Sequence, residues 1–133
     1  MSLKSIHNLY TYIGVHIPEC VIVSHFYHSP SPDAQAKVWI TLGGDKILAR
    51  LRTRRKPQSS SPIFNEALTA TVEPSQMKNI SVNVSLANEN RQALKKDIGQ
   101  VILCGQASAE EFRHWNDVLA SPGKQIAEWH ELR

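Results

Sequence analysis

Two stretches of the chain alternate strictly between aliphatic and other residues. The stretches 36–42 (AKVWITL) and 80–86 (ISVNVSL) each place an aliphatic side chain at every second position. Because successive side chains of a β-strand point to opposite faces, this pattern predicts strands with one buried face. Less regular strands, each bounded by turn residues, are expected at 46–54, 67–72, 98–103 and 126–130. Short strands separated by turns predict an all-β antiparallel sandwich.

One segment has a helical pattern instead. In SAEEFRHWNDVLASPG, residues 108–123, Ser108 is followed three residues later by Glu111, which is the spacing of a capping box. The apolar residues that share one helical face are Phe112, Trp115, Val118 and Leu119. Residues 121–123 (SPG) end the segment. We therefore expect a single helix of about three turns, with Trp115 packed into the body.

The composition fits one domain. The chain has 133 residues, 41% hydrophobic and 20% charged, which is enough for one compact core but not for two. We therefore expect a single domain over residues 1–133. Cys20 and Cys104 form no CxxC pair, which argues against a disulfide framework and favours a reducing compartment. Without a signal-peptide pattern or an apolar run of about 20 residues, we expect a soluble cytoplasmic chain, alone or cut from a longer anchored protein.

A cluster of basic residues follows the first alternating stretch. Arg50, Arg52 and Arg54 occupy every second position, and Arg55 and Lys56 extend the run. We call residues 50–56 the basic segment. If it is a strand, its three alternating arginines project from one face and form an anion-binding surface. The alternatives are a solvated edge strand whose charge prevents edge-to-edge pairing, and a nuclear-localisation or phosphate-binding patch. The net charge of +3 and the lack of interleaved aromatics argue against nucleic acid.

The histidines and serines do not form a recognisable reactive site. His25 and His28 are three residues apart, a spacing that puts strand side chains on opposite faces, and His114 and His130 lie elsewhere in the sequence. We expect surface or half-buried histidines and no zinc site. The serines at 59–61 lack a GxSxG elbow. The sequence therefore predicts no enzyme, no metal and no cofactor.

The segments AKVWI, SPIFNEAL, ISVNVSLANEN, DIGQVIL, HWNDVL and IAEWHEL occur in this order, with the basic strand after the first. Over residues 33–133, their order and spacing resemble a synaptotagmin-type C2 domain. The helix before the last strand, and a WHxL element formed by Trp129, His130 and Leu132, are similar to the second of the tandem domains, C2B. The resemblance implies a sandwich of about seven to eight strands whose loops at one end bind calcium and acidic membranes.

The chain departs from this family where calcium would bind. The resemblance keeps Asp33 as one acid of the first loop, while the other position falls near Tyr27. In the second loop, Asn88 and Asn90 stand where aspartates are expected, and Lys96 stands at or beside a third. Calcium needs several oxygen ligands and negative charge, which amides lack and a lysine opposes. The resemblance therefore implies a calcium-independent member.

Residues 1–32 fit the family poorly. Strands are expected at 10–17 and 20–27, which leaves either a missing strand or a shortened first loop. A missing strand would leave an open sheet edge able to pair with another copy of the chain. At the other end, we expect Trp129 and Leu132 to pack into the body while His130 and Glu131 stay accessible.

The favoured function is calcium-independent binding of phospholipid, protein or both in vesicle trafficking and exocytosis. The basic segment would engage anionic phospholipids or acidic protein surfaces, and the resemblance adds SNARE and other trafficking proteins as partners. The alternative is an interaction or oligomerisation scaffold that uses the helix and residues 128–133 (EWHELR) and does not bind lipid. Either module would be peripheral at membranes, alone or within a longer anchored or tandem-C2 protein.

Overall fold

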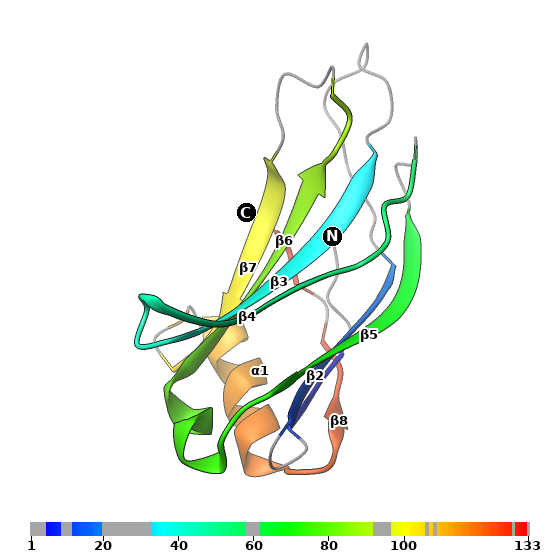
Figure 1. The fold of residues 1–133 in the computed structure, drawn as a ribbon. Coiled ribbons are helices and arrows are strands. Elements are labelled where there is room, and N and C mark those ends of the chain that lie inside the picture. Colours follow the sequence, from blue (N-terminus) through cyan, green and yellow to red (C-terminus); the bar gives the residue numbers. More distant parts are fainter. Residues whose placement is uncertain are drawn as a thin grey trace.

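The part of the chain that the structure describes forms two four-stranded antiparallel sheets packed face to face (Figure 1). The computed structural model describes residues 5–8, 12–19, 33–57, 62–91, 97–105, 107, 109–128 and 130–132. The first sheet has the order β5-β2-β1-β8, and the second has the order β4-β3-β6-β7. The strands are β1 (Ser5–Asn8), β2 (Tyr12–Glu19), β3 (Ala34–Leu42), β4 (Lys46–Arg52), β5 (Ile63–Thr71), β6 (Ile80–Asn88), β7 (Asp97–Leu103) and β8 (Gln125–Ile126). A 3-10 turn, η1 (Pro74–Asn79), precedes β6, and a helix, α1 (Ala109–Ala120), precedes β8. The predicted antiparallel sandwich with one helix before the last strand is confirmed.

The core lies between the sheets and is built on the two alternating stretches. In the β3–β6 pair, Val38 lies opposite Val84 and Ile40 opposite Val82, and all four side chains are fully buried. The intervening residues of both strands are half-buried or exposed on the outer face of the second sheet. Burying this aliphatic set is the main favourable contribution to folding.

The N-terminal residues supply two strands of the first sheet. β1 and β2 form an antiparallel pair in which Ser5 lies opposite His16, and β2 continues against β5. Of the two alternatives left open by the sequence, a missing strand is therefore wrong: β1 lies earlier in the chain than any predicted strand, and β2 covers much of the strand expected at 10–17. The strand expected at 20–27 lies outside the described residues.

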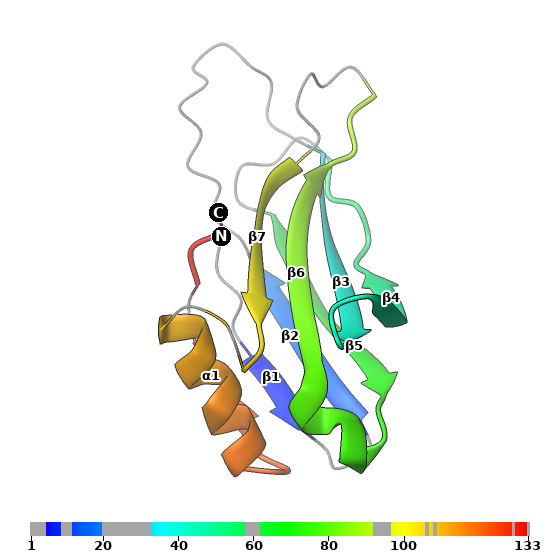
Figure 2. The same cartoon turned by 90° about the vertical axis from the view of Figure 1, so that its left-hand side faces the viewer.

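Helix α1 packs against β7, β1 and β8 at the end of the sandwich where β7 finishes (Figure 2). The extent of the helix agrees with the prediction, but the face that it buries is rotated about the helix axis relative to the predicted apolar face. The residues that this face buries are Glu111, His114, Trp115 and Val118. Phe112, which the sequence pattern places on that face, is 44% exposed, and Ser108 lies outside the described residues. No helix in the described ranges is long and apolar enough to cross a membrane.

Candidate functional site

The basic segment lies on β4, the edge strand of the second sheet, and on the residues that follow it. Its side chains at Arg50, Arg52, Arg54 and Arg55 are exposed, and Lys56 is half-buried. Between them Leu51 is half-buried and Thr53 is buried, so exposure alternates through Arg54 although the strand ends at Arg52. Among the described residues, no carboxylate forms an ion pair with any of these four arginines. Their charges are therefore available to an external anion.

Two residues of β3 lie beside the basic segment on the side away from the sheet edge. Trp39 lies opposite Arg50 and Lys37 lies opposite Arg52, so each pair shares the outer face. The Arg50 guanidinium lies 5.3 Å from the centre of the Trp39 ring, which is cation–π geometry. Neither Lys37 nor Trp39 was assigned to this surface from the sequence. The signal was present, because the alternation that buries Val38 also turns both of its neighbours outward.

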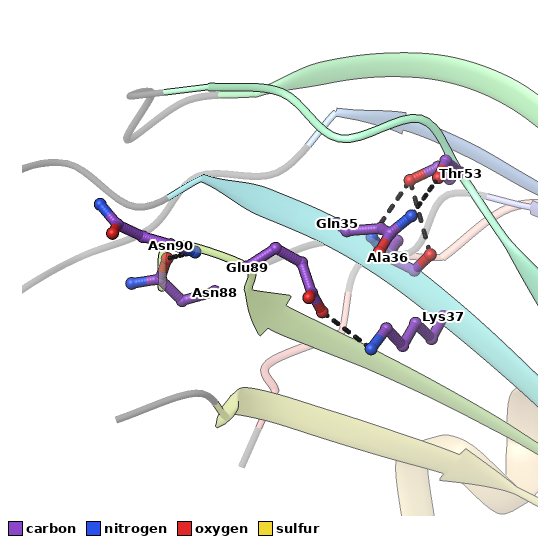
Figure 3. Close-up of polar contacts among 7 residues, drawn as sticks. All are labelled: Gln35, Ala36, Lys37, Thr53, Asn88, Glu89 and Asn90. Atoms are coloured by element: carbon purple, nitrogen blue, oxygen red, sulfur yellow. Dashed lines mark hydrogen bonds and ion pairs between the residues drawn. The ribbon is translucent and has the colours of Figure 1, made fainter. Parts of the chain in front are cut away.

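Thr53 fixes the basic segment to β3 beyond the end of the strand. Its backbone N–H donates to the Ala36 carbonyl at 2.9 Å, and the Ala36 N–H donates to the Thr53 hydroxyl oxygen at 3.1 Å. Gln35 Nε2 donates to the Thr53 carbonyl at 2.8 Å (Figure 3). The next backbone N–H, that of Arg54, donates to Glu66 Oε2 at 2.8 Å. These bonds hold the backbone while the arginine side chains stay in solvent.

The motif PIFNE explains how Glu66 reaches that position. The pairing of β5 with β2 shifts between Ile17 and Glu19, and Asn65 has a φ of 49° beside this irregularity. Asparagine tolerates the left-handed conformation better than most residues do. Phe64, which precedes Asn65, is buried in the core. Glu66, which follows Asn65, instead directs its carboxylate to the Arg54 N–H. The motif thus supports the basic segment.

The loop end whose calcium ligands the sequence predicts to be lost is organised by an amide. Asn88, at the end of β6, lies beside the start of β3, and its Oδ1 accepts from the backbone N–H groups of Asp33 and Asn90, each at 3.1 Å. Glu89 turns away from Asn88 and pairs with Lys37 through a 2.8 Å contact between Oε1 and Nζ (Figure 3). Lys96 and Tyr27 lie outside the described residues. The Asn88 side-chain oxygen thus already accepts hydrogen bonds from the protein's own backbone.

A shallow hollow of about 420 Å³ lies next to these residues on the outer face of the second sheet. Lys37 and Trp39 line the side nearer β4, and Asp97 and Gln100 line the side of β7. Asn83 Nδ2 donates to Gln100 Oε1 at 3.1 Å across its floor. The hollow is open, its lining mixes polar and apolar groups, and it adjoins the basic segment toward the middle of the sheet.

Comparison with known proteins agrees with this architecture. No family model matches the chain. It is 32% identical to human synaptotagmin-5 and 34% identical to Drosophila melanogaster synaptotagmin 1, each over 101 residues that make up 76% of the chain. The A-type C2 domain of RIM from Drosophila superposes with a TM-score of 0.71 at 18% identity, over 99% of this chain and 95% of that one. The chain is a synaptotagmin-like C2 domain. The A-type C2 domain of plant Extended Synaptotagmin 1 shares the fold at a TM-score of 0.57 and 15% identity, over 74% of this chain and 71% of that one.

This C2 domain matches only 26% of human synaptotagmin-5 and 21% of Drosophila synaptotagmin 1. The relatives therefore contain much more chain than the part that this domain matches. What they do as whole proteins bears on this C2 domain only as a proposal.

The WHxL element of the C2 domain differs from its expected arrangement. His130 is 3% exposed, so the expectation that it stays accessible is wrong, whereas Glu131 is exposed as predicted. Leu132 is half-buried and packs on the core, and Trp129 lies outside the described residues. The prediction of surface or half-buried histidines also fails for His114, which is fully buried and whose Nδ1 lies 2.7 Å from His130 Nε2. Burial, and then the proximity of His114, lowers the pKa of His130 below its usual value.

Proposed function

We propose that this C2 domain is a non-catalytic, calcium-independent module that docks on anionic phospholipid through the basic segment. It would act in vesicle trafficking or exocytosis, at the cytoplasmic face of a membrane, as a C2B-like domain does. The observation that carries the proposal is the exposed row Arg50, Arg52, Arg54 and Arg55, supported by a backbone held through Thr53. An arginine guanidinium binds a phosphate through two parallel hydrogen bonds.

The expected strength is modest. Each basic side chain near an anionic surface contributes about 1 kcal/mol, so the five of the basic segment contribute up to about 5 kcal/mol before ordering costs. Such docking is reversible. A second domain or anchor in the same protein would strengthen it by raising the effective concentration at the membrane.

Independence from calcium is proposed from the state of the loop residues. The Asn88 oxygen accepts two backbone hydrogen bonds, and Glu89 is paired with Lys37, so neither is aimed at a common ion. Calcium sites need six to eight oxygens with several carboxylates among them. An ion held by the described part of these loops would have to break the hydrogen bonds to Asn88 and the ion pair between Glu89 and Lys37.

Co-sedimentation with vesicles tests the proposal. The wild-type chain should bind vesicles of phosphatidylcholine with phosphatidylserine equally well in calcium and in chelator, and should not bind phosphatidylcholine alone. Arg50→Gln combined with Arg52→Gln should weaken binding by about 30-fold, which corresponds to about 2 kcal/mol for two lost charges. A matched control, Lys78→Gln with Lys124→Gln, removes two positive charges elsewhere and should change binding little.

Three results would reject the membrane function. They are equal losses in the two double variants, binding that persists at about 1 M salt, where the screening length is about 3 Å, and binding that requires calcium. Salt-resistant association would instead favour the scaffold.

An acidic protein surface, SNARE proteins included, is a second candidate partner. The hollow of about 420 Å³ beside Lys37 and Trp39 favours it, because its amides suit side-chain contacts better than a flat headgroup layer does. Substituting Gln100 and Asn83 with alanine should then weaken protein binding and leave vesicle binding unchanged.

A further inference from the structure

Three side chains with metal-binding atoms meet between α1 and the segment after β8. His114 comes from the buried face of the helix, and Glu128 and His130 come from the C-terminal segment. One ligand atom of each lies within 4.8 Å of the others. His114 Nδ1 is 2.7 Å from His130 Nε2 and 3.9 Å from Glu128 Oε2. Both imidazoles are buried, whereas the Glu128 side chain is 27% exposed.

The outer atoms of this cluster are already oriented by neighbours. His114 Nε2 lies 2.9 Å from the Ile126 carbonyl, which accepts hydrogen bonds only, so Nε2 carries the proton and Nδ1 presents a lone pair. Arg113 Nη2 donates to Glu128 Oε1 at 2.8 Å, which leaves Oε2 directed toward the histidines. Metal-binding histidines commonly donate their other N–H to a backbone carbonyl, and binding carboxylates are commonly hydrogen-bonded as well.

Two polar atoms of this cluster have no hydrogen-bond partner among the residues that the structure describes. Because His114 Nδ1 is an acceptor, the contact between the rings requires His130 to donate from Nε2. His130 Nδ1, on the far side of the ring, then carries a lone pair and is buried with no partner among the described atoms, so it can take up the proton that Nε2 must give up when Nε2 binds an ion. Glu128 Oε2 is also buried and has no hydrogen-bond partner among the described atoms. Native structures leave few buried polar atoms in this state, and each one calls for an explanation such as an ion.

We propose that His114, Glu128 and His130 form a site for a borderline divalent transition ion, with Zn²⁺ as the ion that the donor set fits. Two neutral imidazoles and one carboxylate are the donors of three-ligand zinc sites, in which water or another group takes the fourth position. Calcium is a poor candidate because it prefers oxygen ligands throughout. The exposed part of Glu128 gives the ion and its water a route from solvent.

Binding requires the two rings to move. Zinc–nitrogen bonds of about 2.0–2.1 Å at a tetrahedral angle place two nitrogens about 3.3 Å apart, so the rings must separate by roughly 0.6 Å from their present contact. The ring planes now differ by only 13°, so the rings must also turn for both lone pairs to reach one ion. The ion would join the helix to the C-terminal segment, at a place unrelated to the basic segment. The sequence predicts no zinc site, because the separation of 16 between the two histidines is not a recognised ligand spacing. Folding brings them together.

Metal titration of the tag-free full chain, after chelator treatment, tests the site. Calorimetry with Zn²⁺ should show one ion per chain, and Co²⁺ should give the visible absorption of a four-coordinate site. Glu128→Gln keeps the hydrogen-bond acceptor for Arg113 and should weaken Zn²⁺ binding by more than about 100-fold. Arg113→Gln, which removes the guanidinium that donates to Glu128 Oε1, should weaken it by about 10- to 100-fold.

His16→Gln is the matched control, because His16 lies on β2 with its Nε2 3.3 Å from Asn65 Oδ1, away from the cluster. It should bind Zn²⁺ as the wild type does. His130→Gln should abolish binding, and because that buried substitution can unfold the chain, Glu128→Gln with a wild-type melting curve is the deciding variant. Absence of stoichiometric Zn²⁺ binding, or binding that Glu128→Gln leaves intact, would overturn the proposal.

Discussion

Leu132 packs directly against the backbone of Gly99. A Cβ added to Gly99 would lie 2.8 Å from Leu132 Cβ, closer than Cβ atoms approach other atoms in proteins, and 3.1 Å from the Leu132 carbonyl carbon, which is tighter than most Cβ contacts. Gly99 pairs with Leu86, whose side chain is fully buried, so this contact lies on the core side of β7. The end of the WHxL element thus packs against β7 at Gly99, where the absence of a side chain leaves room for Leu132.

Gly99→Ala should therefore destabilise the domain. Overpacking of this kind costs about 1–3 kcal/mol, because either β7 or the C-terminal segment must move. Urea unfolding followed by tryptophan fluorescence measures the loss. Gly105→Ala is the control, since nothing lies within 4 Å of the added Cβ there. Equal stability of both variants would mean that the C-terminal segment moves away from β7 without cost.

Trp115→Ala should be the more damaging helix substitution. Trp115 is 1% exposed in the interface between α1 and the sheets, and removing a large buried aromatic costs about 3–5 kcal/mol. Phe112→Ala, at an aromatic that is 44% exposed, should cost much less. Thermal unfolding of both variants compares the two faces. A stable Trp115→Ala variant would indicate that the helix contributes little to the fold.

Thr53→Val should weaken vesicle binding without removing a charge. The substitution keeps the shape of the side chain but leaves the buried Ala36 N–H without its 3.1 Å acceptor, at a cost of about 1–3 kcal/mol. The backbone under Arg54 and Arg55 then loosens, so co-sedimentation with anionic vesicles should fall. Thr69→Val, at an exposed position of β5, should change neither property. Full vesicle binding by Thr53→Val would show that a fixed backbone is not needed.

Stability should decrease in mild acid because of His130. Its pKa in the folded state lies below the unfolded value of about 6.5, chiefly because of burial and then of His114, although Glu128 and Glu111 offset part of the shift. Below about pH 6.5 the unfolded chain therefore binds more protons, and the free energy of unfolding falls with pH until the folded pKa is reached. Urea unfolding in chelator between about pH 7.5 and about pH 5.5 measures this slope.

The loss of unfolding free energy in acid should be smaller in His130→Gln and unchanged in His16→Gln. The same urea series measures both variants. A wild-type slope in His130→Gln would assign the acid sensitivity to another group.

Local patterns are enough to predict the parts of this fold that depend on nearest neighbours in sequence. The alternation around Val38 and Val84 predicts the central strand pair, and the spacing of the arginines predicts their alternating exposure. The helix is also predictable, but the phase of its buried face is not, because Phe112 and Trp115 are both apolar in sequence and only His114, packed against the C-terminal segment, distinguishes the faces.

Features that depend on distant segments cannot be predicted in this way. The hydrogen bond from the Arg54 backbone to Glu66 joins the residues after β4 to a strand of the other sheet, and neither residue signals the other. The contact between His114 and His130 likewise depends on the path of the chain through β8, a strand of only two residues that carries almost no pattern of its own. In both cases tertiary packing, rather than local preference, determines the neighbour.

The position of Trp39 beneath Arg50 gives the protein an internal optical reporter. Trp39 is 43% exposed and Trp115 is buried, so their indoles emit from environments of different polarity. A phosphate that draws the Arg50 guanidinium from its place 5.3 Å from the centre of the Trp39 ring changes the surroundings of the exposed indole and leaves the buried one unaffected. Docking on the basic segment can therefore be followed by the fluorescence of the unlabelled protein, with Trp39→Phe removing the signal.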